Sequence, residues 1–563
     1  MAEPTRPEVY SIAAHRGFAD ALVAGLVPRY AKDGLGLARL TLLLPSGRAI
    51  RTVSEAFIRH MGEEGGGGLL LPRMVTIGDL SLDEALGPLL DPLVASDIPP
   101  AVDPTYRWLR LAALLSEEMG ADAPEGPPLF RQARMIAETM DRLLVEDIAP
   151  EDLLGERVLD VVGSVAGHWQ NSLRRFARVQ ARWRVELAEM GRVDAATRRN
   201  LLFAHAAESW RAEPPATPIV AAGVTSAAPA LARLLRVVSE LPEGSVILPD
   251  LDLSLDDEVW ADLGLAGQSE EADGPPIGRA DALTHPQYHL KLLLNRMGVN
   301  RAEVQPWHRA GIAAARPDRS TAISNLFLPP GPSARWAGLD IEQRRLAGVT
   351  LMESANPEEE AQAIAIRIRE ALETPEKRVA LVTPDRGLAS RVVAHLRRWH
   401  IEADDTAGTP LPQTAPGRLF LLAAELMGGE GGPIALSALL QHPLVMREGD
   451  RARWLENARR FDRELRGPRP APGLAPLRAV AEKNRLGDWW GEVEALLAPL
   501  FEPREEIALD AALDLLAETS EALGSVGLWG GAEGRALSAF LEELREQARD
   551  VPTALEPREL PSI

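Results

Sequence analysis

The chain has 563 residues, 46% of them hydrophobic, a formal net charge of −21 and no cysteine. This length predicts about three or four domains at roughly 150 residues each. The lack of cysteine excludes disulfides, cysteine-ligated zinc and iron–sulfur clusters. The negative charge argues against indiscriminate binding of nucleic acid, which needs Lys and Arg to neutralise phosphates, but it leaves room for a local basic channel.

Short apolar runs that predict strands alternate with amphipathic segments that predict helices in two parts of the chain. The strands are expected at 9–14, 40–44, 218–223 and 245–248, and the helices at 18–30, 49–60 and 228–240. Such alternation is typical of a parallel, doubly wound sheet. We therefore assign residues 1–100 and 210–310 to a first α/β domain.

Residues 101–209 show only helical spacing of apolar residues, and we interpret them as a helical insertion. One of its helices carries Arg174, Arg178 and Arg182 at intervals of four, which places them along a single face. Arginines interleaved with aromatic residues suit contacts to a nucleic-acid backbone and its bases, so these three are candidates for DNA contact. The alternative is a solvated face on which they pair with the abundant carboxylates.

A second α/β pattern follows a polar, Gly- and Pro-rich stretch at 311–346, which we interpret as a linker. We assign residues 347–425 to this second, incomplete α/β domain. Residues 426–563 again show only helical spacing and are expected to form a further helical insertion.

One strand–turn–helix–strand unit dominates the second α/β pattern. After a helix at 357–372, the expected elements are a buried strand at 379–382, a turn at 383–386, a helix at 388–399 and a strand from 401. The last strand runs into a loop punctuated by Gly408 and Pro410. This order predicts a βαβ unit with its functional loops at the carboxyl ends of the strands.

The motifs of an ATP-driven motor and of a nuclease are missing. A P-loop needs Gly-x-x-x-x-Gly-Lys-Ser/Thr, but residues 14–20 after the first strand have one glycine and no lysine. Only Arg16 could imitate a phosphate contact there. No lysine of the chain stands in a Gly-Lys-Ser/Thr sequence, or two positions after an acidic residue as a PD-(D/E)xK nuclease requires. We therefore predict no catalytic, cofactor-binding or metal-binding residue in this chain.

Two weaker constellations have simpler explanations. Residues 249–252, Pro-Asp-Leu-Asp, follow an apolar strand and superficially resemble a Walker B metal site. We interpret them as a strand-end turn with a helix N-cap. His285 and His289 have the spacing of two metal ligands on one helical face, but no third ligand is evident, so a packing or surface role is expected.

No leader and no membrane span are predicted. The first residues lack a basic segment followed by a long apolar run. No stretch approaches the ~20 uninterrupted apolar residues of a transmembrane helix. We therefore expect a cytoplasmic protein.

Several stretches, in order along the chain, resemble one known family. They are LTLLLPSGR at 40–48, LLLPRMVTIGDL at 69–80, HPQYHLKLLLNRMGV at 285–299, LVTPDRGLASRV at 381–392 and IEADDTAGTPLPQT at 401–414. Together they resemble the AddB subunit of the AddAB helicase–nuclease, in its alphaproteobacterial form, over nearly the whole chain. The resemblance implies two UvrD-like helicase-type (RecA-like) parallel-sheet domains with large helical insertions. Family members continue with a nuclease domain, so we expect an N-terminal portion.

The resemblance also implies a role in double-strand break repair and recombination. The expected activity is that of a scaffold that binds double-stranded DNA ends and single-stranded DNA. ATP and Mg²⁺ are expected only through the partner subunit AddA, because this chain lacks a P-loop. Ser46, Arg48, Thr383, Arg386 and Thr409 are expected to line the strand-end surface where a working helicase holds DNA.

Two other functions stay open. The chain could be a small-molecule α/β enzyme, such as a nucleotide-sugar transferase with two Rossmann-like halves. That enzyme would need acid–base residues in the cleft between the halves, and the sequence offers no convincing set. The other alternative is an interaction protein that keeps vestigial folds and does not bind DNA.

Overall fold

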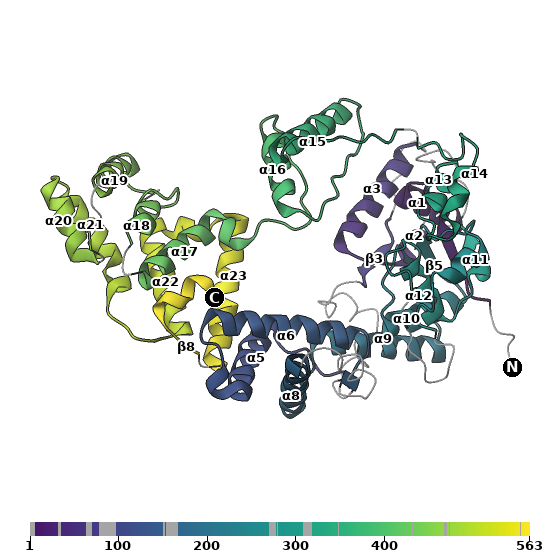
Figure 1. The fold of residues 1–563 in the computed structure, drawn as a ribbon, viewed down its shortest axis with the longest axis horizontal. Coiled ribbons are helices and arrows are strands. Elements are labelled where there is room, and N and C mark those ends of the chain that lie inside the picture. The colour runs from purple at the N-terminus through teal and green to yellow at the C-terminus, as the bar shows by residue number, and fades with distance from the viewer. Residues whose placement is uncertain are drawn as a thin grey trace. The chain divides into compact units, whose positions relative to one another are not determined.

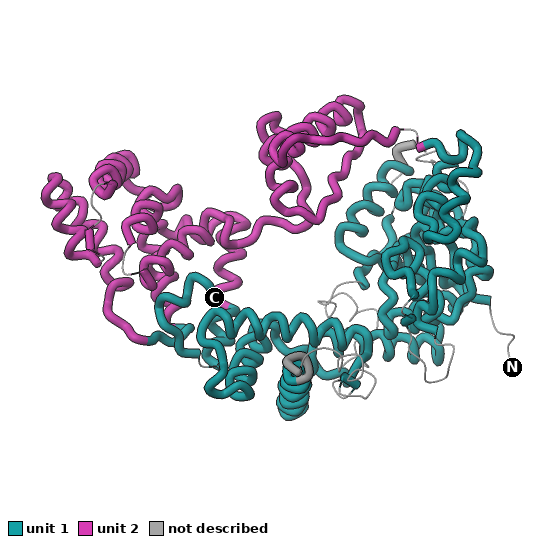
Figure 2. Tube along the Cα trace, viewed as in Figure 1, with its two compact units in different colours: residues 1–345, 506–510, 543–563 teal, residues 346–505, 511–542 magenta. Residues whose placement is uncertain are grey.

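The computed structural model divides into two compact units (Figure 2). Unit 1 comprises residues 1–345, 506–510 and 543–563, and unit 2 comprises residues 346–505 and 511–542. The structure describes residues 6–31, 35–63, 70–77, 97–149, 152–153, 167–268, 277–278, 280–307, 318–346, 348–429, 432–446, 448–466, 470–471, 473–551 and 553–563. None of the helices described is long and apolar enough to cross a membrane.

A six-stranded parallel sheet forms the centre of unit 1. Its strands are β1 (Val9–Ile12), β2 (Thr41–Leu44), β3 (Arg73–Thr76), β4 (Ile219–Ala222), β5 (Gly244–Pro249) and β6 (Gln305–Pro306). They lie in the order β3-β2-β4-β5-β1-β6, and every neighbouring pair is parallel. The α/β class and the four expected strands are confirmed, and the sheet is consistent with a RecA-like fold. The two edge strands, β3 and β6, were not expected from the sequence.

Both faces of this sheet are covered by helices, which is why its central strands are mainly apolar on both faces. Successive residues of a strand face opposite sides, so Leu42 and Leu43 enter different cores. One core packs α1 (Phe18–Tyr30) and α3 (Gly47–Glu63) against the sheet, beside the short α2 (Gly36–Arg39). The other packs α9 (Ala195–Ala212), α10 (Pro229–Glu240) and α12 (Tyr288–Met297) against it (Figure 1).

The described residues between β3 and β4 are mainly helical, as expected, apart from an isolated bridge between Ala101 and Val193. The helices are α5 (Pro104–Met119), α6 (Pro127–Val145), α8 (Gly167–Met190) and α9. The side chain of Asp103 caps α5 by accepting from the amides of Thr105 and Tyr106, and Pro104 occupies the first helical position. A buried network joins α5 to the residue before α9: Arg107 pairs with Asp194 at 2.9 Å and with Asp141 of α6 at 2.6 Å.

Two further parts of the chain after β5, residues 250–345 and the segments 506–510 and 543–563, also belong to unit 1. They include α11 (Asp257–Asp262), α13 (Asp318–Leu326) and α14 (Arg335–Gly338), so the expected linker at 311–346 contains helices. The antiparallel pair β7 (Ile507–Ala508) and β8 (Ala554–Leu555) belongs to unit 1 as well. The region 426–563, which we expected to form one insertion, is therefore divided between the units.

Unit 2 contains only helices and extended segments among its described residues. The expected helices at 357–372 and 388–399 are present as α15 (Pro357–Leu372) and α16 (Arg386–Arg397), packed through a small apolar cluster. The rest is helical: α17 (Ala415–Gly428), α18 (Pro433–Leu440), α19 (Arg451–Leu465), α20 (Leu474–Lys483) and α21 (Gly487–Leu497). The last two helices, α22 (Leu509–Gly524) and α23 (Gly531–Asp550), run across the boundary with unit 1.

The prediction of two strands in this unit, at 379–382 and from residue 401, is wrong. Residues 379–382 lie extended, but no strand pairs with them in the part of unit 2 that the structure describes. The same holds for the residues that follow Ile401. Val382 is 92% exposed, and Leu351, in another extended segment, is 85% exposed. A strand exists only where neighbouring strands accept its backbone hydrogen bonds, and among the described residues no strand pairs with these segments.

Candidate functional site

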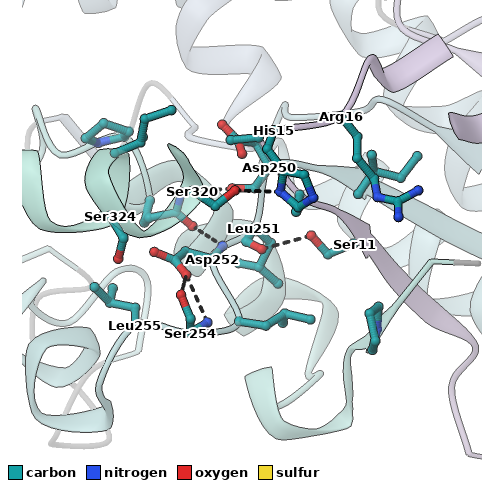
Figure 3. A pocket seen from close by; sticks show the side chains of 18 of the residues that line it. Ser11, His15, Arg16, Asp250, Leu251, Asp252, Ser254, Leu255, Ser320 and Ser324 are labelled. Carbon is teal, nitrogen blue, oxygen red and sulfur yellow. Dashed lines mark hydrogen bonds between the residues drawn. The ribbon is translucent and has the colours of Figure 1, made fainter. Parts of the chain in front are cut away.

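A cavity of about 710 Å³ opens at the carboxyl ends of β1 and β5 (Figure 3). These neighbouring strands lead in different directions: the chain from β1 continues to β2, whereas the chain from β5 passes β1 to reach β6. In doubly wound sheets, ligands bind at such a reversal of strand order. Helix α13 (Asp318–Leu326) closes one side with Ser320 and Ser324, which share a helical face, and Phe327 follows directly after the helix. This pocket is the candidate functional site of unit 1.

The turn after β5 is held rigidly at the pocket. The Gln287 side chain donates to the Asp250 carbonyl at 2.9 Å and accepts from the Asp252 amide at 2.9 Å. Ser11 on β1 donates to the Leu251 carbonyl at 2.9 Å. Asp250 itself has a φ of +62°, a left-handed conformation that Asp and Asn tolerate better than most residues. The strand-end turn expected here is confirmed.

The expected helix cap at this turn is wrong. Asp252 accepts from the amide and hydroxyl of Ser254, at 2.9 and 2.6 Å, which is a local Asx turn. Helix α11 begins only at Asp257, and the side chain of its N-cap residue, Asp256, makes no capping hydrogen bond. Asp252 therefore fixes the loop beside the pocket and leaves its other carboxylate oxygen without a role in the turn.

The ionisable groups of the pocket are perturbed by burial. Burial raises the pKa of Asp250 to about 6, and the nearby carboxylate of Asp252 adds to the shift. Burial lowers the pKa of His15, assisted by Arg16, and burial also lowers the pKa of His285. Both imidazoles are therefore neutral at pH 7. His15 Nδ1 lies 2.8 Å from the Ser320 hydroxyl, which connects the β1 turn to α13.

Asp250 should make the protein less stable as the pH rises. Its unfolded pKa is 3.8 and its folded pKa is about 6, so the folded state loses stability between these values. For a carboxyl group fully shielded from solvent, a pKa shift of about two units lowers the free energy of unfolding by about 3 kcal/mol. Because solvent reaches Asp250, we expect a loss of about 1 kcal/mol. Asp250→Asn should therefore raise the unfolding temperature at pH 7.5 and not at pH 4, measured by circular dichroism.

Asp147 supplies the matched control for this prediction. It too has a left-handed φ, +63°, but it lies on the surface, 3.4 Å from Arg233. Asp147→Asn controls for the better fit of asparagine to left-handed backbone. An equal shift in both variants at both pH values would show that backbone preference, and not the partly desolvated charge of Asp250, explains the result.

The arginine face predicted on α8 is largely paired within unit 1. Arg178 donates to Glu118 at 2.7 Å, and Arg182 bonds to Glu117, both on α5. Arg174 is exposed on the same helix. For Arg178 and Arg182 this geometry favours the alternative of a solvated, carboxylate-paired face over DNA contact.

Ser46 and Arg48 lie at the carboxyl end of β2, in unit 1. The Ser46 hydroxyl accepts from the Ala49 amide at 3.2 Å and so caps α3, while Arg48 is exposed at the first turn of that helix. A serine that caps a helix next to an exposed arginine places a hydroxyl, a guanidinium and a helix N-terminus together. This local arrangement is suited to an anion.

Thr383, Arg386 and Thr409 belong to unit 2. The Thr383 hydroxyl accepts from the Asp385 amide at 3.0 Å, and Arg386 makes a two-pronged pair with Asp405 at 3.0 and 2.7 Å. Thr409 is exposed four residues beyond Asp405. The pair therefore brings the turn at 383–386 and the loop at 405–409 together, which sequence reasoning had not identified because Asp405 carries no motif.

The pocket differs in chemistry from a nucleotide-phosphate site, since the described residues that line it include two carboxylates, Asp250 and Asp252, and a single arginine, Arg16. Across the described residues, no group of three or more His, Asp or Glu could hold a metal ion. The helix that closes the pocket was missed because it falls in the expected linker, although Ser320, Ile323, Ser324 and Phe327 have helical spacing. No protein-family model and no curated protein matches this chain.

Proposed function

We propose that this chain is a helicase-like scaffold that binds a DNA end and docks an AddA motor subunit during double-strand break repair and recombination. The observation that carries the proposal is the architecture of unit 1, a doubly wound parallel sheet interrupted between β3 and β4 by helices. Two of the stretches that resemble the AddB family, 40–48 and 285–299, belong to this unit, and the first of them is the strand–turn sequence that contains Ser46 and Arg48.

The motor itself is proposed to reside in the partner. In a P-loop ATPase, backbone amides and a lysine surround phosphate at the end of the first strand. In this chain that position offers His15 and Arg16, in a pocket that Asp250 and Asp252 also line. The carboxylates would repel phosphate, which supports a scaffold without its own ATPase. ATP and Mg²⁺ would act in AddA, and a nuclease site would lie outside this chain.

Residues 347–425 are proposed to be part of a second α/β domain. Helices α15 and α16 would cover one face of its sheet, and the extended segments at 349–353, 379–382 and 401–405 would be its strands. Their exposed apolar side chains support this interpretation, since exposure of apolar surface to water does not stabilise the free chain. The strands would pair only when neighbouring strands are supplied.

Arg386 gives the most direct test of DNA binding. A DNA phosphate could replace Asp405 as the two-pronged partner of its guanidinium. Fluorescence anisotropy with a forked DNA end, with and without AddA, should show salt-sensitive binding. Arg386→Ala should weaken this binding about tenfold and lower the dependence of log K on log salt by about one.

Two control variants isolate the role of this arginine. Asp405→Asn removes the competing charge but keeps an oxygen for the Ala407 amide, so it should bind DNA at least as well as the unchanged protein. Arg453→Ala removes a surface arginine of α19 that pairs with Glu492 at 2.7 Å, and should have no effect. Binding that is insensitive to salt, or equally weakened by Arg453→Ala, would remove the proposal.

A further inference from the structure

The segment 379–382 presents an unpaired strand edge in unit 2. Its residues, Val, Ala, Leu and Val, lie between the turn that ends at Glu376 and the bend at Pro384. All four are exposed, Val379 to 40%, Leu381 to 37% and Val382 to 92%. Among the described residues, no backbone–backbone hydrogen bond involves their amides or carbonyls. Exposed apolar side chains on an unpaired backbone favour the addition of another strand.

This segment lacks the features that usually protect a strand edge. Natural edge strands carry a charged residue, a proline or a bulge that prevents pairing with another chain. Residues 379–383 contain no charged residue and no proline. The extended segment at 401–405 differs, because its three carboxylates would repel the same segment of another copy. Residues 379–383 are therefore able to pair with an identical segment, whereas residues 401–405 are not.

The residues that flank the segment complement themselves in one direction only. In an antiparallel pair centred on Leu381, Lys377 of one copy lies opposite Asp385 of the other, and twofold symmetry repeats this pair. A parallel pair would instead place Lys377 and Arg378 against the same two residues. Opposite charges across a ladder are stabilising and like charges are destabilising. The charges therefore favour the antiparallel arrangement.

Pro384 is compatible with this register. In an antiparallel ladder, pairs of residues that exchange two backbone hydrogen bonds alternate with pairs that exchange none. If Leu381 forms a bonded pair with its copy, Pro384, three positions away, falls in a non-bonded pair, where its missing N–H is not required. In the same register Val382 lies opposite Ala380 of the other copy, so the most exposed side chain of the segment becomes covered.

We propose that residues 377–385 form an antiparallel β-ladder with the same residues of a second copy of this chain, so that the protein is a weak, twofold-symmetric dimer. This inference concerns the chain by itself and depends neither on DNA binding nor on AddA. Two short strands bury much less than the ~1,200 Å² of a stable interface, so we expect a dissociation constant on the order of tens of micromolar.

Sedimentation velocity of the full chain, at concentrations from about 1 to about 300 µM, tests the proposal. The expected result is a monomer at the lowest concentration and a dimer at the highest, with no larger species. Val382→Lys should abolish the dimer, because it places a charged side chain in the ladder. The fold of the monomer should not change, since this side chain already lies in water.

Ile434→Lys is the matched control for Val382→Lys. Ile434 is an apolar residue of unit 2 that is 73% exposed, but it lies on helix α18 and not on a strand edge. The same change from an exposed apolar side chain to lysine should therefore leave the dimer unchanged. A dimer weakened equally by both variants would contradict the assignment to residues 379–382.

Charge variants test the register. Lys377→Glu should weaken the dimer about tenfold at low ionic strength, because two acidic side chains then face each other at both ends of the ladder. Adding Asp385→Asn removes this repulsion and should recover most of the lost affinity. Asparagine still accepts from the Gly387 amide, so the cap of α16 is kept. A loss caused by misfolding would not be recovered by the second substitution.

Hydrogen exchange at several protein concentrations gives an independent readout. In the dilute monomer the segment is unpaired, so its amides exchange rapidly, and their protection should rise as the dimer forms. The register predicts protection of alternate amides, those of Val379, Leu381 and Thr383, because the intervening amides point away from the other copy. Protection of the intervening amides instead would refute this register.

The proposal would be overturned by a chain that stays monomeric at all concentrations, by a dimer that Val382→Lys leaves intact, or by assembly that continues to larger species. A loss in Lys377→Glu that Asp385→Asn does not recover would also count against it. A monomer that gains protection at 379–382 only when AddA is added would show that this edge pairs with the partner protein and not with a second copy.

Discussion

Replacing Asp194 with alanine should lower the free energy of unfolding of unit 1 by about 3–5 kcal/mol, the largest effect expected for a polar residue of this chain. Asp194 is 4% exposed and lies 2.9 Å from Arg107 Nε, which is itself 6% exposed. The same carboxylate oxygen accepts from the Trp183 indole at 3.0 Å. The variant would leave a buried guanidinium held by Asp141 and the Ala137 carbonyl, and a buried indole N–H that has lost its acceptor.

Two variants separate the charge from the hydrogen bond. Asp194→Asn keeps an oxygen for Trp183 but loses the charge beside Arg107, so its loss should be intermediate. Asp122→Ala, at an exposed position after α5, should change stability by less than about 0.5 kcal/mol. Urea unfolding followed by circular dichroism measures all three. If Asp194→Ala unfolds at the same urea concentration as Asp122→Ala, the network does not stabilise the insertion.

The central strands of unit 1 could be predicted because burial on both faces requires an uninterrupted run of apolar residues, which is visible in the sequence. Leu42–Leu44 and Val220–Ala222 are uninterrupted apolar runs, and each lies between two other strands. The edge strands β3 and β6 carry Arg73, Gln305 and Pro306, residues that no apolar pattern reveals. Their pairing follows from the strands beside them, which is tertiary information.

In the second α/β region, by contrast, an apolar run was not enough to predict a strand. Val379–Val382 is as apolar as the strands of unit 1, and a run of this kind records only that the segment favours burial. Whether it becomes a strand depends on neighbours elsewhere in the chain or in a partner. The helices were predictable because their caps are local: Asn356 and Asp385 accept from the amides that open α15 and α16.

The candidate site was predictable only in part. The strand-end position of Asp250 follows from the apolar run before it. The pocket around Asp250 is formed with Gln287 and α13, which lie 37 or more positions further along the chain. The pair between Arg386 and Asp405 is missed for the same reason. Motif reasoning finds single residues at strand ends, whereas the pocket is a property of the loops that meet there.

Hydrogen exchange should show that the strand-like segments of unit 2 are unpaired in the free chain. The amides of Val379–Val382 should exchange at close to the rate of an unfolded peptide, because no ladder protects them. Those of Val220–Ala222 in β4 should be protected by about a thousandfold or more, since they open only with the core of the sheet. The matched contrast is between two apolar runs of similar composition, one paired and one exposed. Equal protection of both would mean that residues 379–382 are already in a sheet.

The same measurement discriminates between the proposed functions. If residues 347–425 are half of a helicase-type domain, supplying AddA or the neighbouring strands should raise the protection of Val379–Val382 toward that of β4. Val382→Lys should block this gain without changing the stability of the free chain, because the side chain is already in water. A vestigial interaction protein would show no gain in protection with either addition. A domain that is completed by its partner would bury these segments. Burial of their apolar side chains would then stabilise the assembled state relative to the free chain.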